Sequence, residues 1–176
     1  MIAEIKNKTT TGEDELTGNF FGTLRYIKFE NVLLPVLLDT SHCENDSIKR
    51  ILSGQMFDES KFEFWKRADG LGEIDCYIEN DNVAIGIEVK YNSDLSSEDQ
   101  LIREAKMLNK WAANKHKILL FIAKNKESCE GPYYNNYLKC KQLDVTLFWC
   151  SWKEIYNKLK EINIITQYNN ILINDV

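Results

Sequence analysis

Two neighbouring stretches of the chain alternate between apolar and polar residues, and this pattern constrains the fold most. Residues 73–79 and 83–91 are typical of strands, and Asn80, Asp81 and Asn82 lie between them. Asn and Asp tolerate the positive φ that a two-residue hairpin turn needs. A turn centred on Asp81 and Asn82 predicts an antiparallel hairpin in which paired residue numbers sum to 163.

This register sorts the side chains of the hairpin onto two faces of a sheet. One face is apolar and consists of Ile74, Cys76, Ile78, Val83, Ile85, Ile87 and Val89. The other carries Glu73, Asp75, Tyr77, Glu79, Ala84, Gly86, Glu88 and Lys90. Asp75 then lies directly opposite Glu88, with Cβ atoms about 4.5–5.5 Å apart, a distance at which like charges destabilise a sheet.

A divalent cation between the two carboxylates would reverse the sign of that interaction. Asp75, Glu88 and the backbone carbonyl of Val89 would form a hard oxygen site suited to Mg²⁺. Lys90 shares the face of Glu88, because residues two apart in a strand point the same way. Its ammonium group could therefore reach a water or a phosphate.

An ordinary amphipathic hairpin with a wet polar face is the alternative interpretation. Three features favour a site. The two acids oppose each other, Ala84 and Gly86 leave room beside them, and a helix with a polar first turn follows.

The rest of the chain is typical of helices and strands arranged around this hairpin. The expected elements are a helix at 12–29 capped by Thr11, two short helices within 31–54, a strand at 62–67, a turn at 68–72, a helix at 97–114, a strand at 117–123, a loop at 125–134, a short helix at 135–142, a strand at 145–150, a helix from the cap Ser151 to about Lys160, and a C-terminal helix. This order predicts an α/β fold with a mixed sheet flanked by helices. No linker is evident, so 1–176 is expected to form a single domain.

Composition narrows the class of protein. Apolar residues make up 44% of 176 residues, which is enough for a packed core. No apolar run reaches the roughly 18 residues that a membrane span needs, and the first residues lack the apolar core of a signal peptide. The five cysteines include no Cys-x-x-Cys pair, which argues against a zinc site or disulfide framework and favours a reducing cytoplasm.

The net charge of −5 argues against a protein that passively coats nucleic acid. One segment departs from this balance, since residues 103–126 carry a single acid, Glu104. Its basic residues are Arg103, Lys106, Lys110, Lys115, Lys117, Lys124 and Lys126. They form either a local basic surface or an ordinary solvated helix face with a strand end, and the sequence leaves both interpretations open.

Asp75, followed after the hairpin by Glu88, Val89 and Lys90, resembles the motif of the PD-(D/E)XK phosphodiesterase superfamily. That superfamily includes restriction endonucleases and many repair and phage-defence nucleases. Its motif usually has a proline before the aspartate, where this chain has Ile74, although members often lack that proline.

The family core is a helix, three strands, a helix and a strand, which is the order expected here. The resemblance covers about residues 12–124 and implies a restriction-endonuclease-like core. The C-terminal strand and helices, 125–176, match nothing in that pattern.

The resemblance also implies two further site residues. Many members place a glutamate on the first helix, and Glu15 is the best match, with Glu13 and Asp14 as alternatives. Many place a glutamine at the start of the helix after the lysine strand, and Gln100 has this position. Gln100 also fits a capping box opened by Ser97, and the two roles need not exclude each other.

The function implied by the resemblance is Mg²⁺- or Mn²⁺-dependent hydrolysis of nucleic-acid phosphodiester bonds, with DNA favoured, in phage defence, repair or restriction. Asp75, Glu88 and the Val89 carbonyl would hold the ion, and Glu15 would support the site or a second ion. Lys90 is expected to stay charged, because the register places Glu73 opposite it, and to act electrostatically rather than as a base.

Arg103, Lys106 and Lys110 are the candidates for contact with nucleic acid. Two alternatives remain at this stage. One is a catalytically inactive member of the fold that binds nucleic acid or protein. The other is a subunit of a defence or toxin-type complex, which the acidic charge and the tyrosine-rich segment 131–137 would suit. Many nucleases of this fold pair up, so a homodimer is also an option.

Overall fold

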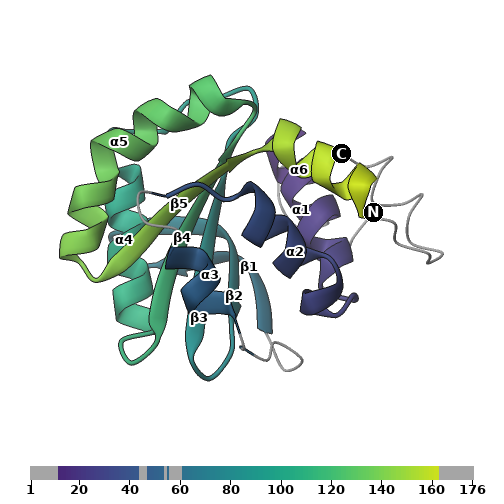
Figure 1. Cartoon of the computed structure of the whole chain (residues 1–176). Helices are drawn as coiled ribbons and strands as arrows, with labels where there is room; N and C mark the ends of the chain where they lie inside the picture. The colour runs from purple at the N-terminus through teal and green to yellow at the C-terminus, as the bar shows by residue number, and fades with distance from the viewer. Residues whose placement is uncertain (1–11, 44–46, 54, 56–60, 163–176) are drawn as a thin grey trace.

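Five strands form one mixed sheet that helices cover on both faces in the computed structural model of the chain (Figure 1). The structure describes residues 12–43, 47–53, 55 and 61–162. The elements are α1 (Gly12–Leu24), η2 (Phe29–Asn31), α2 (Leu33–Thr40), α3 (Ser47–Leu52), β1 (Lys61–Ala68), β2 (Gly72–Glu79), β3 (Val83–Val89), α4 (Gln100–Trp111), β4 (His116–Ala123), α5 (Lys126–Gln142), β5 (Val145–Ser151) and α6 (Trp152–Glu161). The predicted Thr11 cap and C-terminal helix lie outside the described residues. None of the described helices combines the length and apolarity that crossing a membrane requires.

The strands follow their sequence order across the sheet, and the pairing changes from antiparallel to parallel at β3. β1, β2 and β3 form an antiparallel meander, whereas β3, β4 and β5 run parallel. Helices α4 and α5 make the two parallel connections and lie on the same face of the sheet (Figure 1). The carboxyl ends of the three parallel strands therefore meet at one edge, where α/β sheets commonly bind ligands. The predicted mixed sheet flanked by helices is confirmed.

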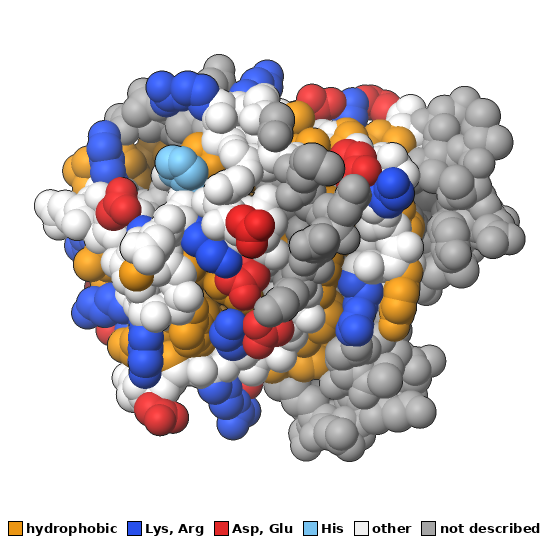
Figure 2. All heavy atoms as spheres, turned by 90° about the horizontal axis from the view of Figure 1, so that it is seen from below, with side chains coloured by type: hydrophobic (Ala, Val, Ile, Leu, Met, Phe, Trp, Pro, Cys, Tyr) orange, Lys and Arg blue, Asp and Glu red, His pale blue; other side chains and the backbone are white. Residues whose placement is uncertain are grey.

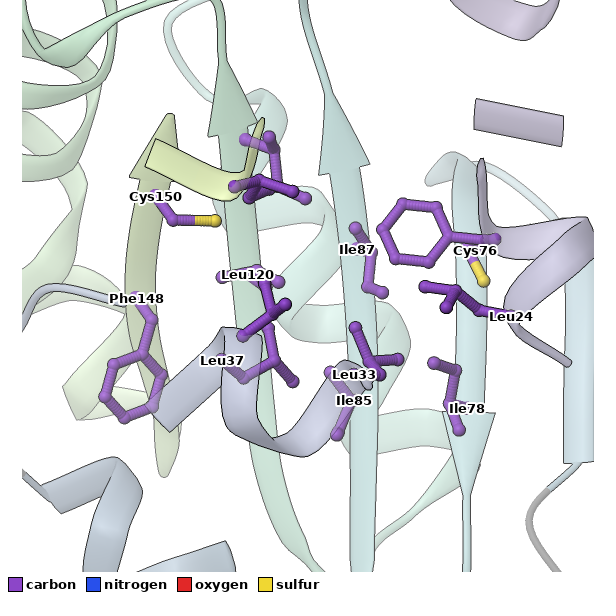
Figure 3. Close-up of a cluster of buried hydrophobic side chains, with 14 of the residues drawn as sticks. Leu24, Leu33, Leu37, Cys76, Ile78, Ile85, Ile87, Leu120, Phe148 and Cys150 are labelled. Atoms are coloured by element: carbon purple, nitrogen blue, oxygen red, sulfur yellow. The ribbon is translucent and has the colours of Figure 1, made fainter. Parts of the chain in front are cut away.

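Each face of the sheet has its own apolar core. Helices α1, α2 and α6 pack on one face against side chains such as Ile78, Ile85 and Leu120 (Figure 3). Helices α4 and α5 pack on the other, where Leu101 and Leu108 are buried. Every residue of β3 is buried because this strand lies between the two layers.

The predicted register of the hairpin between β2 and β3 is confirmed. Cys76 pairs with Ile87 and Glu79 pairs with Ala84, so the paired numbers sum to 163. The positive φ expected at the turn is wrong, because Trp65 and Asp144 are the two non-glycine residues with positive φ in the described part of the chain. The side chain of Asn80 closes the turn instead, accepting hydrogen bonds from the backbone N–H groups of the residues two and three positions later.

The predicted apolar face of β2 is interrupted at Asp75. Trp65 of β1 has a φ of 51°, and the ladder between β1 and β2 omits Trp65 and Asp75 while keeping its register on either side. Cys76 packs in the α1 core, whereas Ile74 packs in the α4 core. The expectation that Ile74 shares a face with Cys76 is therefore wrong. Simple alternation fails here because the ladder is interrupted where Trp65 has its positive φ, and the residues on either side of Asp75 pack on opposite faces.

Two helix starts differ from the sequence predictions. α4 begins at Gln100, and its N-cap Asp99 makes no side-chain capping hydrogen bond. The Ser97 hydroxyl donates to the carboxylate of Asp99, so the predicted capping box between Ser97 and Gln100 is wrong.

The expected loop at 125–134 is instead the first half of α5. Asn125 caps this helix by accepting from the N–H of Ser128, and Pro132 lies within it. A proline in a helix interior costs about 3 kcal/mol. Burial of Cys129 and Tyr133 against the sheet offsets that cost. By contrast, the predicted cap at Ser151 is confirmed and forms a capping box with Glu154.

Candidate active site

Glu88 lies at the carboxyl end of β3, and 2% of its surface is exposed. Two residues earlier in β3, at Gly86, helix α4 packs closely against the strand. A Cβ atom at Gly86 would lie 3.0 Å from side-chain atoms of both Ile74 and Leu108. The absence of a side chain at Gly86 therefore lets the helix approach the strand. The space expected beside Asp75 and Glu88 is filled by the side chains of Ile74 and Leu108, so the prediction of open space is wrong.

The ammonium group of Lys90 and the side-chain amide of Gln100 contact the same oxygen of Glu88. The Lys90 ammonium lies 2.7 Å from Glu88 Oε1, and Gln100 Nε2 donates to that oxygen at 2.5 Å. Gln100 is oriented from behind, because its Oε1 accepts from the N–H of Ser96 at 2.7 Å. Residues from β3 and from the start of α4 are thus brought together, as the sequence predicted for Gln100.

The predicted partner of Lys90 is wrong. Glu73 pairs with Arg67 at 2.6 Å on the neighbouring strand, and Lys90 pairs with Glu88. Burial alone would lower the pKa of Lys90, but the charge and hydrogen bond of Glu88, together with the charge of Asp75, outweigh it and raise that pKa. The ammonium group therefore stays charged at neutral pH, as expected, although for a different reason.

Asp75 lies one position beyond the last ladder pair of the hairpin, on the strand next to Glu88. It is half-buried, and its Oδ2 accepts a hydrogen bond of 2.8 Å from the N–H of Val89. The negative charge of Asp75 acts on both Lys90 and Glu104. Asp75 therefore lies near the other charged groups of the site.

Glu104 is a member of this cluster that the sequence analysis missed. Its Oε1 accepts from Gln100 Nε2 at 2.9 Å, and its buried Oε2 has no hydrogen-bond partner among the described residues. Burial, reinforced by the negative charges of Glu88 and Asp75, raises the pKa of Glu104 well above its usual value. A signal was available, since Glu104 lies four residues after Gln100 and next to Ala105 on the apolar face of α4.

The first turn of α1 reaches the same region through Glu13. Its Oε1 accepts hydrogen bonds of 2.7–3.0 Å from the backbone N–H groups of Tyr91, Asn92 and Ser93, and the Ser93 hydroxyl also donates to it. Glu15, the residue expected first, is exposed. Of the candidates Glu13, Asp14 and Glu15, it is Glu13 for which hydrogen bonds to the loop after Lys90 are seen. Its carboxylate accepts from backbone N–H groups of that loop.

The donor set fits a hard divalent cation in its chemistry but not as a preformed cage. The charges of Asp75 and Glu88 act on both Lys90 and Glu104. Oxygen donors of this kind suit Mg²⁺, and the partnerless Oε2 of Glu104 adds one more. In the described part of the chain, however, no three His, Cys, Asp or Glu side chains converge as ready ligands. An ion would need some of the present contacts to open.

The basic segment after Gln100 is divided by its ion pairs. Arg103 bonds to the carbonyl of Leu71 and pairs with Asp99. The remaining pairs of this segment are Lys115 with Glu79, Lys117 with Asp144, and Lys126 with Glu130. Lys106 and Lys110 are exposed on α4 and make no ion pair with a described residue. The segment as a whole therefore does not form one continuous basic surface.

A family model described as "Domain of unknown function (DUF4143)" matches residues 41–143 of the chain. The matched range contains all of the cluster around Lys90 and excludes α1 with Glu13. No curated protein and no solved structure matches the chain.

Proposed function

We propose that this chain, which belongs to the DUF4143 family of domains of unknown function, is a metal-dependent nuclease that hydrolyses phosphodiester bonds, with DNA as the favoured substrate. One observation carries the proposal. The carboxylates of Asp75 and Glu88, on adjacent strands, both act on Lys90 at the carboxyl end of β3, and the buried Glu104 lies beside Glu88. Two carboxylates held this close repel one another, and a shared cation would offset that repulsion, whereas the raised pKa of Glu104 favours its neutral form.

The finer fold assignment belongs to the same proposal. α1, β1, β2, β3, α4 and β4 follow in the order of a restriction-endonuclease-like core, with an antiparallel meander and then a parallel crossover. The Asp75 to Lys90 motif lies on the second and third strands of that core, as in the superfamily that it resembles. β5 and α6 extend the sheet and its covering layer beyond the core.

The residues of this chain divide the chemical work between them. Asp75, Glu88 and the carbonyl of Val89 would hold a divalent ion. When bound, such an ion neutralises charge on the phosphate and lowers the pKa of water. Lys90 supplies a fixed positive charge for the negative charge that grows on the phosphate during hydrolysis. Gln100 orients the Glu88 carboxylate, and Ser96 orients Gln100.

The test is cleavage by the purified chain of supercoiled plasmid, linear duplex, single-stranded DNA and RNA, with Mg²⁺ or Mn²⁺ and then with EDTA. We expect cleavage that EDTA abolishes, and a loss of about a hundredfold or more in Asp75→Asn, Glu88→Gln and Lys90→Ala. Glu79→Gln is the matched control on β2, since Glu79 pairs with Lys115 at the opposite end of the strand. Cleavage that survives EDTA, or variants that cut as well as the wild-type chain, would refute the assignment.

A non-catalytic nucleic-acid-binding member of the same fold is the second candidate. Two observations favour it: the Glu88 carboxylate is already paired with Lys90, and the described carboxylates do not converge on one point. Calorimetric titration with Mn²⁺ separates the two candidates, because a nuclease binds the ion through Asp75 and Glu88. A chain that takes up no Mn²⁺ yet retains DNA would support the binding role.

A further inference from the structure

A pocket of about 270 Å³ opens beside Lys90, at the carboxyl ends of β3 and β4. The loop that follows β3 forms one wall through Tyr91 and Ser93, and Lys124 and Ser128, at the end of β4 and the start of α5, form another. Asp75, Glu88 and Glu104 are not among its lining residues. The pocket therefore adjoins the carboxylate cluster and shares Lys90 with it.

The lining of this pocket is amphipathic. Its cations are Lys90 and Lys124, and among the described residues that line it Asp94 is the one acid. Leu95, Phe121 and Pro132 give it an apolar side. A volume of about 270 Å³ lies just below the range in which proteins usually bind small organic molecules, roughly 300–1,000 Å³. A group with one anionic and one apolar part fits this lining better than a bare inorganic anion.

Lys124 is available to such a group. Within the described part of the chain it forms no ion pair, and its ammonium lies 5.2 Å from the centre of the Tyr91 ring. Two residues further on, Lys126 pairs with Glu130 on the surface of α5. Lys90 is paired with Glu88 and lies between the pocket and the carboxylates. Lys124 is therefore the cation that the pocket can offer to a second phosphate.

We propose that this pocket is a subsite for one nucleotide of the substrate strand, adjacent to the bond that is cut. Lys124 binds the phosphate of that nucleotide, and the apolar wall with Tyr91 receives its sugar and base. The inference rests on the proposed nuclease function and extends it to a substrate-binding residue. It places the strand along the carboxyl edge of β3 and β4, with Lys90 between the two phosphates.

The first experiment measures binding without cleavage. Thymidine 3′,5′-bisphosphate is titrated into the full chain in EDTA and followed by calorimetry, with inorganic phosphate as a parallel probe. We expect the bisphosphate to bind more tightly than phosphate, and Lys124→Ala to weaken its binding about tenfold. Lys126→Ala is the matched control and should leave the affinity unchanged. Equal affinity for the two probes, or no effect of Lys124→Ala, would overturn the subsite.

The second experiment separates this inference from the function on which it rests. On single-stranded DNA with Mg²⁺, Lys124→Ala should raise KM about tenfold and leave kcat near the wild-type value, because it removes binding shared by ground and transition states. A wild-type chain that cleaves while Lys124→Ala has an unchanged KM refutes the subsite and leaves the nuclease intact. A wild-type chain that binds the bisphosphate through Lys124 but cleaves nothing refutes the nuclease instead.

Discussion

The amino and carboxyl ends of the parallel strands differ in how their charged side chains are paired. At the amino ends, near the turn between β2 and β3, two lysines of the described chain each have their own counter-charge. Lys115 pairs with Glu79 at 2.7 Å, and Lys117 pairs with Asp144 at 3.0 Å. Figure 2, which views the molecule from below, shows Lys and Arg side chains interspersed with Asp and Glu side chains.

At the carboxyl end of β3 the charges are not paired one to one. Lys90 faces Asp75 and Glu88 as well as Glu13, while Glu104 is buried beside them. A chain that pairs its charges one to one at one end can do so at the other, so the excess of carboxylates is not a general property of its sequence. Ion pairs therefore balance the charges at one end of the sheet, whereas the other end gathers carboxyl groups around Glu88.

The largest expected effect comes from removing the shared lysine. Lys90→Met keeps the apolar stem but leaves the buried Glu88 carboxylate without the cation it pairs with, so we expect a loss of about 3 kcal/mol in the free energy of unfolding. Lys115→Met at the opposite end breaks a more accessible pair and should cost about 1 kcal/mol or less. Urea denaturation in EDTA measures both. Equal losses at the two ends would remove the contrast on which the comparison rests.

The next effect is stabilisation by divalent ions. If Asp75 and Glu88 hold an ion in the folded chain alone, Mn²⁺ at a hundred times its Kd adds about 2.7 kcal/mol to the free energy of unfolding. We expect the thermal midpoint of the wild-type chain to rise with Mn²⁺, and that of Asp75→Asn to stay constant. Glu79→Gln, at the balanced end, should respond like the wild-type chain. A rise that persists in Asp75→Asn would place the ion elsewhere.

A smaller effect distinguishes the two ends by their dependence on pH. Because the pKa of Glu104 is raised in the folded chain, folding becomes less favourable as pH rises above about 4.5. Glu104→Gln should remove that loss and stabilise the chain by about 1 kcal/mol at pH 7 in EDTA. The amide keeps the shape of the side chain, so a change in packing is not the cause.

Glu79 should behave in the opposite sense. Burial would raise its pKa, but hydrogen bonds from Lys115 and Tyr77 outweigh burial and lower it. Its contribution is present above the ordinary pKa of a glutamate and is lost as pH falls. Glu79→Gln should therefore destabilise the chain at pH 7 by less than 1 kcal/mol. Stability curves measured between pH 3 and pH 8 would contradict the comparison if both variants shifted in the same direction.

The sequence was sufficient for those features that depend on local periodicity. Alternation and the Asn80–Asn82 turn predicted the register of the hairpin, and Ser151 as a cap residue predicted the start of α6. The shared face of Glu88 and Lys90 followed from the period of a strand, whereas the place of Gln100 beside them was implied by the family resemblance. These are short-range properties, and a single sequence carries them.

Features that depend on contacts between distant segments were not predictable in this way. The turn of β1 at Trp65 moved Ile74 to the other core, and no local pattern marks it. The loop expected around Gly131 and Pro132 became helix because burial against the sheet outweighs the cost of the proline. Glu104 was noted only as the single acid of segment 103–126, although its place four residues after Gln100 on the apolar face of α4 marks it as buried.

The smallest expected effect compares the two loops at the ends of β3. The Glu13 carboxylate accepts hydrogen bonds from the N–H groups of 91–93. The neutral side-chain amide of Asn80 accepts hydrogen bonds from two N–H groups of its turn. Burial would raise the pKa of Glu13, but these N–H groups and the Ser93 hydroxyl lower it. The hydrogen bonds that the Glu13 carboxylate accepts are therefore fully present above the ordinary pKa of a glutamate. They are lost as pH falls through the lowered pKa of Glu13.

We expect acidification from pH 7 to pH 3 to reduce hydrogen-exchange protection at Tyr91 and Ser93, after correction for intrinsic exchange, and to leave protection at Val83 unchanged. Glu13→Gln should lower protection at the first loop at pH 7 and abolish its dependence on pH. Asn80→Ala is the matched variant and should lower protection at Asn82 and Val83 at every pH while leaving Tyr91 and Ser93 unchanged. Equal sensitivity of the two loops to acid would show that the Glu13 carboxylate does not hold the segment that follows Lys90. Lys90 would then depend on Glu88 and Gln100 for its position.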